Sequence, residues 1–208
     1  MGIPCWTRAG LIDLGDLKPE HLTAAELGEA MAKINRFGGR TPEPWSVAAH
    51  SVLVEALCPP ELKPWALLHD AHKVFLGDLT DPAVELLCQS GTRPAVENAI
   101  RNAEGAIDRR IAAAWGVAVR SMSEQLRAAD QIAFLAETWV FLGARPGPLP
   151  PAETDMLDRA VSILVSMSTA DDWRVALNLW LARVDELAKH GALAPPRTTD
   201  PASTVLTG

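Results

Sequence analysis

The segment Ala66-Leu67-Leu68-His69-Asp70-Ala71-His72 is an apolar helical run from which an adjacent histidine and aspartate emerge. Moving an ionised carboxylate out of water costs several kcal/mol unless another group compensates its charge. A divalent cation is the strongest compensator available to such a carboxylate. Neighbouring side chains on a helix diverge by about 100°, but both can reach a metal ion seated at the helix end. The segment therefore predicts a helix that supplies His69 and Asp70 to a metal site.

Two further polar residues interrupt apolar helical faces elsewhere in the chain. His50 shares the face of an earlier helix with Val47 and Val54, and Asp130 interrupts the apolar face of a later one. Two imidazoles and two carboxylates on three helices favour one metal site over four separately satisfied core residues. This donor set does not select among Mn, Co, Mg, Zn, Fe and Ni. The predicted metal ligands are His50, His69, Asp70 and Asp130.

Capping residues and proline breaks divide the rest of the chain into helices. Thr23-Ala24-Ala25-Glu26 has the spacing of a capping box, and Ser46 can cap a second helix that Pro59-Pro60 stops. Strand signals are weak, since β-branched alternation is rare and the chain has no tyrosine. We expect an irregular leader up to Pro19, then helices over residues 23–35, 46–58 and 60–77, a short element after Pro82, and helices over 94–115, 123–142, 153–167 and 171–190.

These helices predict an all-α fold of about seven to eight helices. The chain of 208 residues is long enough for one substantial domain and rather short for two. The Gly- and Pro-rich segment 143–151 is therefore interpreted as a connector between packed helices. We expect one domain over residues 1–190, with its core at about 20–142, extra C-terminal helices at 153–190, and a disordered tail at 191–208.

The overall charge excludes some classes of partner. Nineteen basic residues against 26 acidic ones give a formal net charge of −7, which repels nucleic acid and anionic membranes. A phosphate-bearing ligand would then need a local basic or metallic centre. No apolar run reaches the ~20 residues of a membrane span, and three widely spaced cysteines suggest reduced thiols. We expect a cytoplasmic protein with neither a nucleic-acid nor a membrane partner.

The order of these residues resembles a known family, the HD-domain metal-dependent phosphohydrolases. Its members carry one histidine, then a His-Asp pair, then a distant aspartate. The similarity covers roughly residues 10–142, and the chain is similar to bacterial 5′-deoxynucleotidases and phage dATP triphosphohydrolases. It rests on residues 34–39 with 45–54, on 66–71 with Gly77-Asp78-Leu79, and on Ala128-Ala129-Asp130 with 134–137.

The resemblance implies roles for two residues in the loop before the second helix. Arg36 matches an arginine that contacts the phosphate in similar nucleotidases, and its planar, permanently charged group suits that task. A solvated loop charge is the alternative. Phe37 stands where those enzymes often carry a tryptophan against the sugar or base. Ordinary core packing is the alternative for Phe37.

One position departs from the family pattern. Related enzymes commonly place a glutamate three residues after the aspartate of the His-Asp pair, and this chain has Lys73 there, preceded by His72. Either the acid/base role passes to Asp78 or His72, or Lys73 contacts phosphate, or activity is reduced. Asp78 is the preferred catalytic carboxylate. Glu137 is interpreted either as a residue that orients a metal ligand or as a surface charge.

The resemblance implies an enzyme that removes phosphate from a deoxynucleotide, as a 5′-nucleotidase or as a triphosphohydrolase in a bacterial cell or a phage-infected host. A non-catalytic HD module that senses nucleotides or acts as an interaction scaffold is the alternative, and a nucleic-acid-binding protein is disfavoured by charge. Domains of this kind are often homo-oligomeric. The last helix carries an apolar stripe that suits either the domain core or another subunit, formed by Trp173, Leu177, Trp180, Leu181 and Val184.

Overall fold

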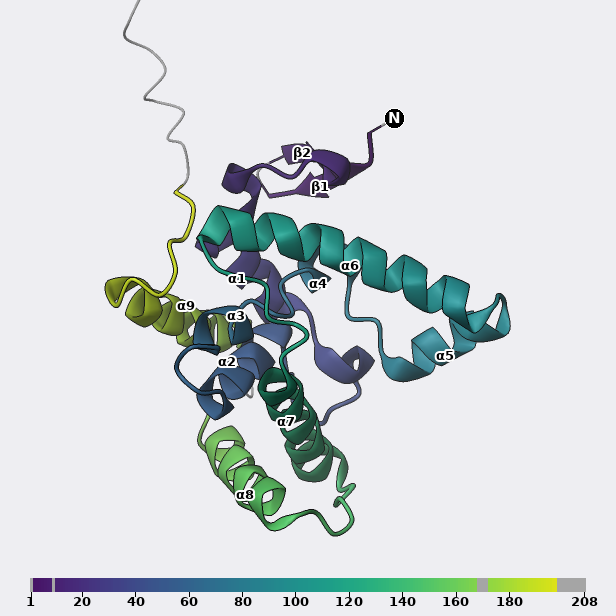
Figure 1. The fold of residues 1–208 in the computed structure, drawn as a ribbon, viewed down its shortest axis with the longest axis vertical. Helices are drawn as coiled ribbons and strands as arrows, with labels where there is room; N and C mark the ends of the chain where they lie inside the picture. Colours follow the sequence, from purple (N-terminus) through teal and green to yellow (C-terminus); the bar gives the residue numbers. More distant parts are fainter. Residues whose placement is uncertain (1, 9, 168–171, 198–208) are drawn as a thin grey trace, which may run out of the picture.

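The computed structural model describes residues 2–8, 10–167 and 172–197, and it confirms the all-α prediction. The described residues form nine α-helices, three short 3₁₀ helices and one small hairpin (Figure 1). None of the described helices is both long and apolar enough to cross a membrane. The α-helices are α1 (Ala24–Lys33), α2 (Val47–Leu57), α3 (Lys63–Ala66), α4 (Lys73–Leu76), α5 (Asp81–Gln89), α6 (Arg93–Trp115), α7 (Glu124–Leu142), α8 (Pro151–Ser166) and α9 (Trp173–Lys189).

The N-terminal segment is more regular than the sequence predicted. Strand β1 (Pro4–Thr7) pairs antiparallel with β2 (Gly10–Asp13), and 3₁₀ helices η1 (Leu14–Asp16) and η2 (Pro19–Leu22) follow. The Asp13 carboxylate accepts hydrogen bonds from Ile3 N at 2.7 Å and Gly15 N at 2.9 Å. Each strand has four residues, too few for a clear alternating pattern. Side-chain bonds to the backbone therefore hold a hairpin that hydrophobic periodicity does not reveal.

The predicted caps start the helices that carry the site. Thr23 Oγ1 accepts from Glu26 N at 3.3 Å at the start of α1, and Ser46 Oγ accepts from Ala49 N at 3.2 Å at the start of α2. Helix α2 is buried along almost its whole length, because α1, α3, α7, α8 and α9 all pack against it. A polar side chain on α2 therefore has no water to solvate it and needs a protein or ligand partner.

The segment 66–72 is not the continuous helix that the sequence predicted. Helices α3 and α4 are separated by turns in which Leu68 N donates to Trp65 O and Ala71 N to Leu68 O, both at 2.9 Å. These bonds span three residues rather than four, so the chain is wound more tightly than an α-helix. The ring of His69 donates from Nδ1 to the Ala66 carbonyl at 2.7 Å. The side chain of His69 is thus the hydrogen-bond donor to a carbonyl group at the end of α3.

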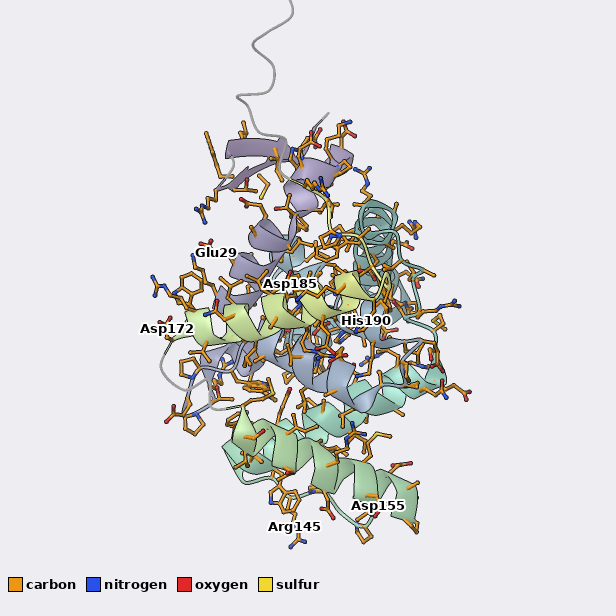
Figure 2. The ribbon with its side chains drawn as sticks, turned by 90° about the vertical axis from the view of Figure 1, so that its left-hand side faces the viewer. Glu29, Arg145, Asp155, Asp172, Asp185 and His190 are labelled. Atoms are coloured by element: carbon orange, nitrogen blue, oxygen red, sulfur yellow. The ribbon has the colours of Figure 1, made fainter. Side chains whose placement is uncertain are left out.

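Helix α9 packs against α1 and α2 (Figure 2) and also contacts this turn segment. The Trp180 indole donates to Leu67 O at 3.1 Å, two residues before His69. Gly28 on α1 makes room for Trp180, since a Cβ there would lie 2.9 Å from the ring. The apolar stripe of the last helix accordingly docks on the domain core through Trp180 and Val184, which are buried. Residue 171, the expected start of this helix, lies outside the described residues.

The chain continues to pack beyond α9. Leu193 is buried, and Ala194 N donates to Trp115 O at 2.9 Å. Residues 191–194, which the sequence assigned to a disordered tail, therefore lie against the end of α6. The predicted tail residues 198–208 lie outside the described residues.

Candidate metal centre

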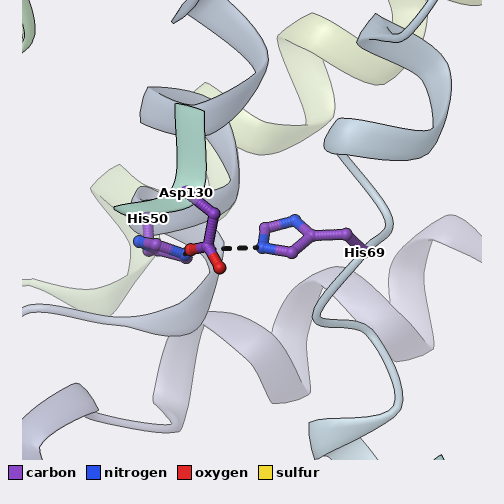
Figure 3. A group of neighbouring side chains, drawn as sticks. All are labelled: His50, His69 and Asp130. Atoms are coloured by element: carbon purple, nitrogen blue, oxygen red, sulfur yellow. Dashed lines mark ion pairs between the residues drawn. The ribbon is translucent and has the colours of Figure 1, made fainter. Parts of the chain in front are cut away.

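Three of the four predicted ligands form a compact group. His50 comes from α2, His69 from the turns between α3 and α4, and Asp130 from α7 (Figure 3). One ligand atom from each lies within 4.8 Å of the others. Asp130 Oδ1 is 3.0 Å from His50 Nε2 and 3.9 Å from His69 Nε2. Two imidazole nitrogens and a carboxylate oxygen thus converge on one point from three separate parts of the chain.

The two imidazoles are oriented as metal ligands. His50 Nδ1 lies 2.6 Å from Glu137 Oε1, and His69 Nδ1 lies 2.7 Å from Ala66 O. A neutral ring that donates from Nδ1 to an oxygen presents Nε2 with its lone pair, which is the usual arrangement behind a histidine that binds a metal. Both Nε2 atoms are fully buried and make no hydrogen bond to the described residues. Since buried polar atoms in folded proteins nearly always have a partner, the residues fit a bound divalent cation.

Asp70, the fourth predicted ligand, adjoins this group but is shared with two cationic side chains. Its Oδ2 lies 3.6 Å from His50 Nε2 and 3.7 Å from His69 Nε2. The same oxygen accepts from Lys73 Nζ at 2.9 Å and from Arg36 Nη1 at 3.5 Å. In spite of burial, these positive neighbours hold the pKa of Asp70 well below its ordinary value. Asp70 is therefore an ionised carboxylate placed to join a metal shell.

The acidic neighbours also change the titration of His69. Burial alone would lower the pKa of its ring, but Asp70 and Asp130 favour the charged form and raise that pKa to about 9. Burial works against ionisation of Asp130 too, yet the two neighbouring histidines keep the pKa of its carboxyl low. In the absence of a metal, the His69 ring is therefore protonated at neutral pH. The site is thus built to hold positive charge.

A cavity of about 580 Å³ opens at Asp130, and His50 and His69 are not among the residues that line it. That volume lies in the range of small-molecule sites, about 300–1,000 Å³. Gln131, Thr138 and Leu142 of α7 and residues 79–82 line part of it. The cavity is also lined by predicted site residues, namely Arg36, Phe37, Asp70, Lys73, Asp78 and Asp130.

Arg36 is not a solvated loop charge. It is buried, and its Nε donates to Glu137 Oε2 at 3.0 Å in addition to the contact with Asp70. Phe37 stacks on Phe134 of α7 with ring centroids 5.8 Å apart, and both rings line the cavity. Phe37 has a positive φ of 55°, which is uncommon for a residue with a side chain. Core packing and a contact with a ligand are therefore compatible for Phe37, because its ring packs on Phe134 and the residue also lines the cavity.

The structure separates the three candidate catalytic residues. Lys73 Nζ lies 2.7 Å from Asp78 Oδ1, and both side chains face the cavity. His72 instead turns toward α6, where its Nδ1 lies 3.0 Å from Asp108 Oδ1 and its Nε2 3.8 Å from Glu104. His72 is not among the residues that line the cavity. Lys73 and Asp78 therefore lie beside the candidate metal centre, and His72 belongs to a separate contact with α6.

Two site residues were not assigned from the sequence. Glu137 was left open between two roles, and its complete burial excludes the surface charge. Its spacing of seven residues from Asp130 signalled the shared helical face, but no pattern showed which groups it contacts. Phe134 was noted only as part of a motif. Its place three residues before Glu137 on the same helix is the signal that could have brought it into the site.

Comparison with known proteins does not place the chain in a family, because no protein-family model matches the sequence and no curated protein matches it at a significant level.

Proposed function

We propose that the protein is a divalent-metal-dependent phosphohydrolase that acts on a deoxynucleotide. One observation carries the proposal. Two buried imidazoles converge on the carboxylate of Asp130, which lines a cavity together with Arg36 and Lys73. Metal ligands and fixed cations around one cavity suit an anionic phosphoryl group. The resemblance to HD-domain phosphohydrolases agrees with this arrangement and supplies the nucleotide as the substrate class.

His50, His69 and Asp130 would hold the metal ion, and Asp70 would join them. A divalent cation bound there would polarise a phosphoryl oxygen and lower the pKa of a water molecule. Arg36 binds the phosphoryl oxygens, since Glu137 and Asp70 fix its guanidinium at the cavity wall. The stacked rings of Phe37 and Phe134 provide an apolar face for the sugar or base.

Asp78 is the proposed proton acceptor. It lines the cavity, and its contact with Lys73 holds its carboxylate in a fixed position. Lys73 would stabilise negative charge that builds up on the phosphoryl group in the transition state. This arrangement replaces the glutamate of related enzymes with a pair of residues, one acidic and one basic. A monophosphate and a triphosphate both remain candidate substrates.

A specific contact favours the second candidate function, a metal-binding nucleotide sensor without turnover. Lys73 is bonded both to Asp70 and to Asp78. The ammonium group of Lys73 thus occupies the Asp78 oxygen that would have to accept the proton. If Asp78 cannot take a proton, the site would bind a nucleotide and not hydrolyse it.

The test is release of phosphate and polyphosphate from a panel of deoxynucleoside mono-, di- and triphosphates, supplied with Mn²⁺, Co²⁺, Mg²⁺ or Zn²⁺. Asp130→Asn removes a proposed ligand, and Asp155→Asn is the matched control because Asp155 is exposed on α8. We expect turnover that Asp130→Asn abolishes and Asp155→Asn preserves. Nucleotide and metal binding without turnover would instead identify the sensor. Absence of metal binding would contradict both functions.

A further inference from the structure

Glu137 contacts two residues of the site with its two carboxylate oxygens. Its Oε1 lies 2.6 Å from His50 Nδ1, and its Oε2 accepts from Arg36 Nε at 3.0 Å. These partners come from α2 and from η3 (Arg36–Gly39), and Glu137 comes from α7. The carboxylate is completely buried. One side chain thus joins a proposed metal ligand to the proposed phosphate-binding arginine.

Two residues of α7 contact the two ring nitrogens of His50. Asp130, two turns before Glu137 on α7, approaches His50 Nε2 at 3.0 Å. With Glu137 on Nδ1, rotation of the ring would break a contact at each nitrogen. A carboxylate behind a histidine ligand fixes its tautomer and makes the other nitrogen a better donor. The α7 helix is therefore a rigid support for the orientation of this imidazole.

The bond to Arg36 has a comparable effect on the guanidinium. Glu137 accepts the hydrogen bond from Arg36 Nε, and Asp70 contacts Arg36 Nη1 only at the longer distance of 3.5 Å. The outer nitrogens of Arg36 therefore remain near the cavity that the residue lines. A planar fork fixed at its base loses less freedom when it binds a planar or tetrahedral anion.

We propose that Glu137 is a positioning residue that serves metal binding through His50 and phosphate binding through Arg36 at the same time. This inference rests on the proposed function, because it takes the site to bind a metal and a phosphoryl anion. It predicts that loss of one carboxylate weakens two binding events whose ligands it does not touch.

A second buried glutamate provides a matched control. Glu55 on α2 is also almost completely buried, and it also holds cationic partners, Arg183 at 2.8 Å and Lys63 at 2.9 Å. Glu55 does not line the cavity. Glu55→Gln therefore removes a buried charge with strong partners from the same core and leaves the site intact.

The experiment measures binding to the whole protein by calorimetry, first of Mn²⁺ and then of inorganic phosphate at saturating Mn²⁺. We expect Glu137→Gln to bind Mn²⁺ about 10- to 100-fold more weakly and phosphate about tenfold more weakly. Glu55→Gln should match the wild type in both measurements. Arg36→Met should lower phosphate affinity, and the double variant with Glu137→Gln should lose no more than Arg36→Met alone, because the two residues act as one unit.

Each outcome separates this inference from the proposed function. Wild type that binds neither Mn²⁺ nor phosphate would contradict both. If the wild type binds both ligands and Glu137→Gln binds them equally well, the positioning role of Glu137 is contradicted and the proposed function is not. A loss of affinity that Glu55→Gln shares would have the same meaning. If Glu137→Gln does not fold, the His50 tautomer decides the question in the metal-free wild type, where no metal on Nε2 forces the proton to Nδ1. Its long-range ¹H–¹⁵N correlations, assigned with His50→Gln, should show protonation at Nδ1, and protonation at Nε2 would overturn the inference.

Discussion

Lys73 Nζ donates to Asp70 Oδ2 at 2.9 Å, and that same oxygen lies 3.6 Å from the Nε2 atom of His50. An ammonium group and a metal ion bound at this site would therefore compete for one carboxylate oxygen. Lys73 has a second carboxylate partner, because Asp78 Oδ1 lies 2.7 Å from the same ammonium group. Lys73 can thus remain paired with Asp78 while Asp70 turns to a metal.

Replacement of Lys73 should strengthen metal binding. Lys73→Met removes a positive charge beside Asp70, and we expect Mn²⁺ affinity to rise by about tenfold, since like charges a few ångströms apart repel strongly in a partly buried site. Calorimetric titration of the metal-free protein gives the comparison. Lys189→Met is the control, because Lys189 is exposed at the end of α9. Weaker Mn²⁺ binding by Lys73→Met would mean that Lys73 supports the metal shell instead of competing with it.

The pKa of His69 predicts how the stability of the metal-free protein depends on pH. Its folded value of about 9 lies above the ordinary value of 6.5, so the folded state holds the proton more tightly than the unfolded state. The resulting stabilisation is fully present below pH 6.5 and is lost as pH rises through 9. Thermal melting in chelator should therefore show a Tm that falls between pH 6.5 and 9. His69→Gln should remove this part of the decline, and an unchanged slope in that variant would contradict the assignment.

The stacked aromatic pair should contribute to nucleotide binding and not to phosphate binding. Phe134→Ala removes one ring of the face that Phe37 and Phe134 present to the cavity. We expect about tenfold weaker binding of a deoxynucleotide and unchanged affinity for inorganic phosphate at saturating Mn²⁺. Phe141→Ala is the control on the same helix, since Phe141 packs against Trp45 away from the cavity. Equal losses for both ligands would show that Phe134 acts through the stability of α7.

The close approach of α9 to α1 should be sensitive to a single methyl group. A Cβ at residue 28 would lie 2.9 Å from Trp180 and 3.0 Å from Leu177. We expect Gly28→Ala to lower the free energy of unfolding by about 1–3 kcal/mol, the usual cost of overpacking a core. Gly105→Ala on α6 is the control, because a Cβ there meets only the flexible end of Arg109 at 3.4 Å. Denaturant unfolding measures both, and a Gly28→Ala variant as stable as the control would contradict the packing.

Local signals made most of the fold predictable. Thr23 and Ser46 each cap the helix that the sequence assigned to them, because a cap depends on residues within one turn. His50 and Asp130 were found for a similar reason, since a polar side chain on an apolar helical face is visible in the periodicity of a single helix. These features need no knowledge of what the helix packs against.

The remaining features depend on contacts between distant residues. The turns at 67–72 reflect the bond from the Trp180 indole to Leu67, 113 positions along the chain. Arg36 and Glu137 are separated by 101 positions. The sequence could therefore predict the element that carries each residue, but not that the two residues contact each other. His72 follows Asp70 closely in sequence, but the tight winding turns it toward α6. Adjacency in sequence therefore suggested a shared site that the structure divides.

The most direct test of the metal centre is the stoichiometry of Co²⁺ bound by the wild type, by Asp130→Asn and by the exposed-site control Asp155→Asn, followed through the visible absorption of the bound ion. The site predicts one Co²⁺ per chain in the wild type and in Asp155→Asn, and a loss of that ion in Asp130→Asn. Tight binding of one Co²⁺ by all three proteins would contradict the centre formed by His50, His69 and Asp130, as would no Co²⁺ bound by the wild type.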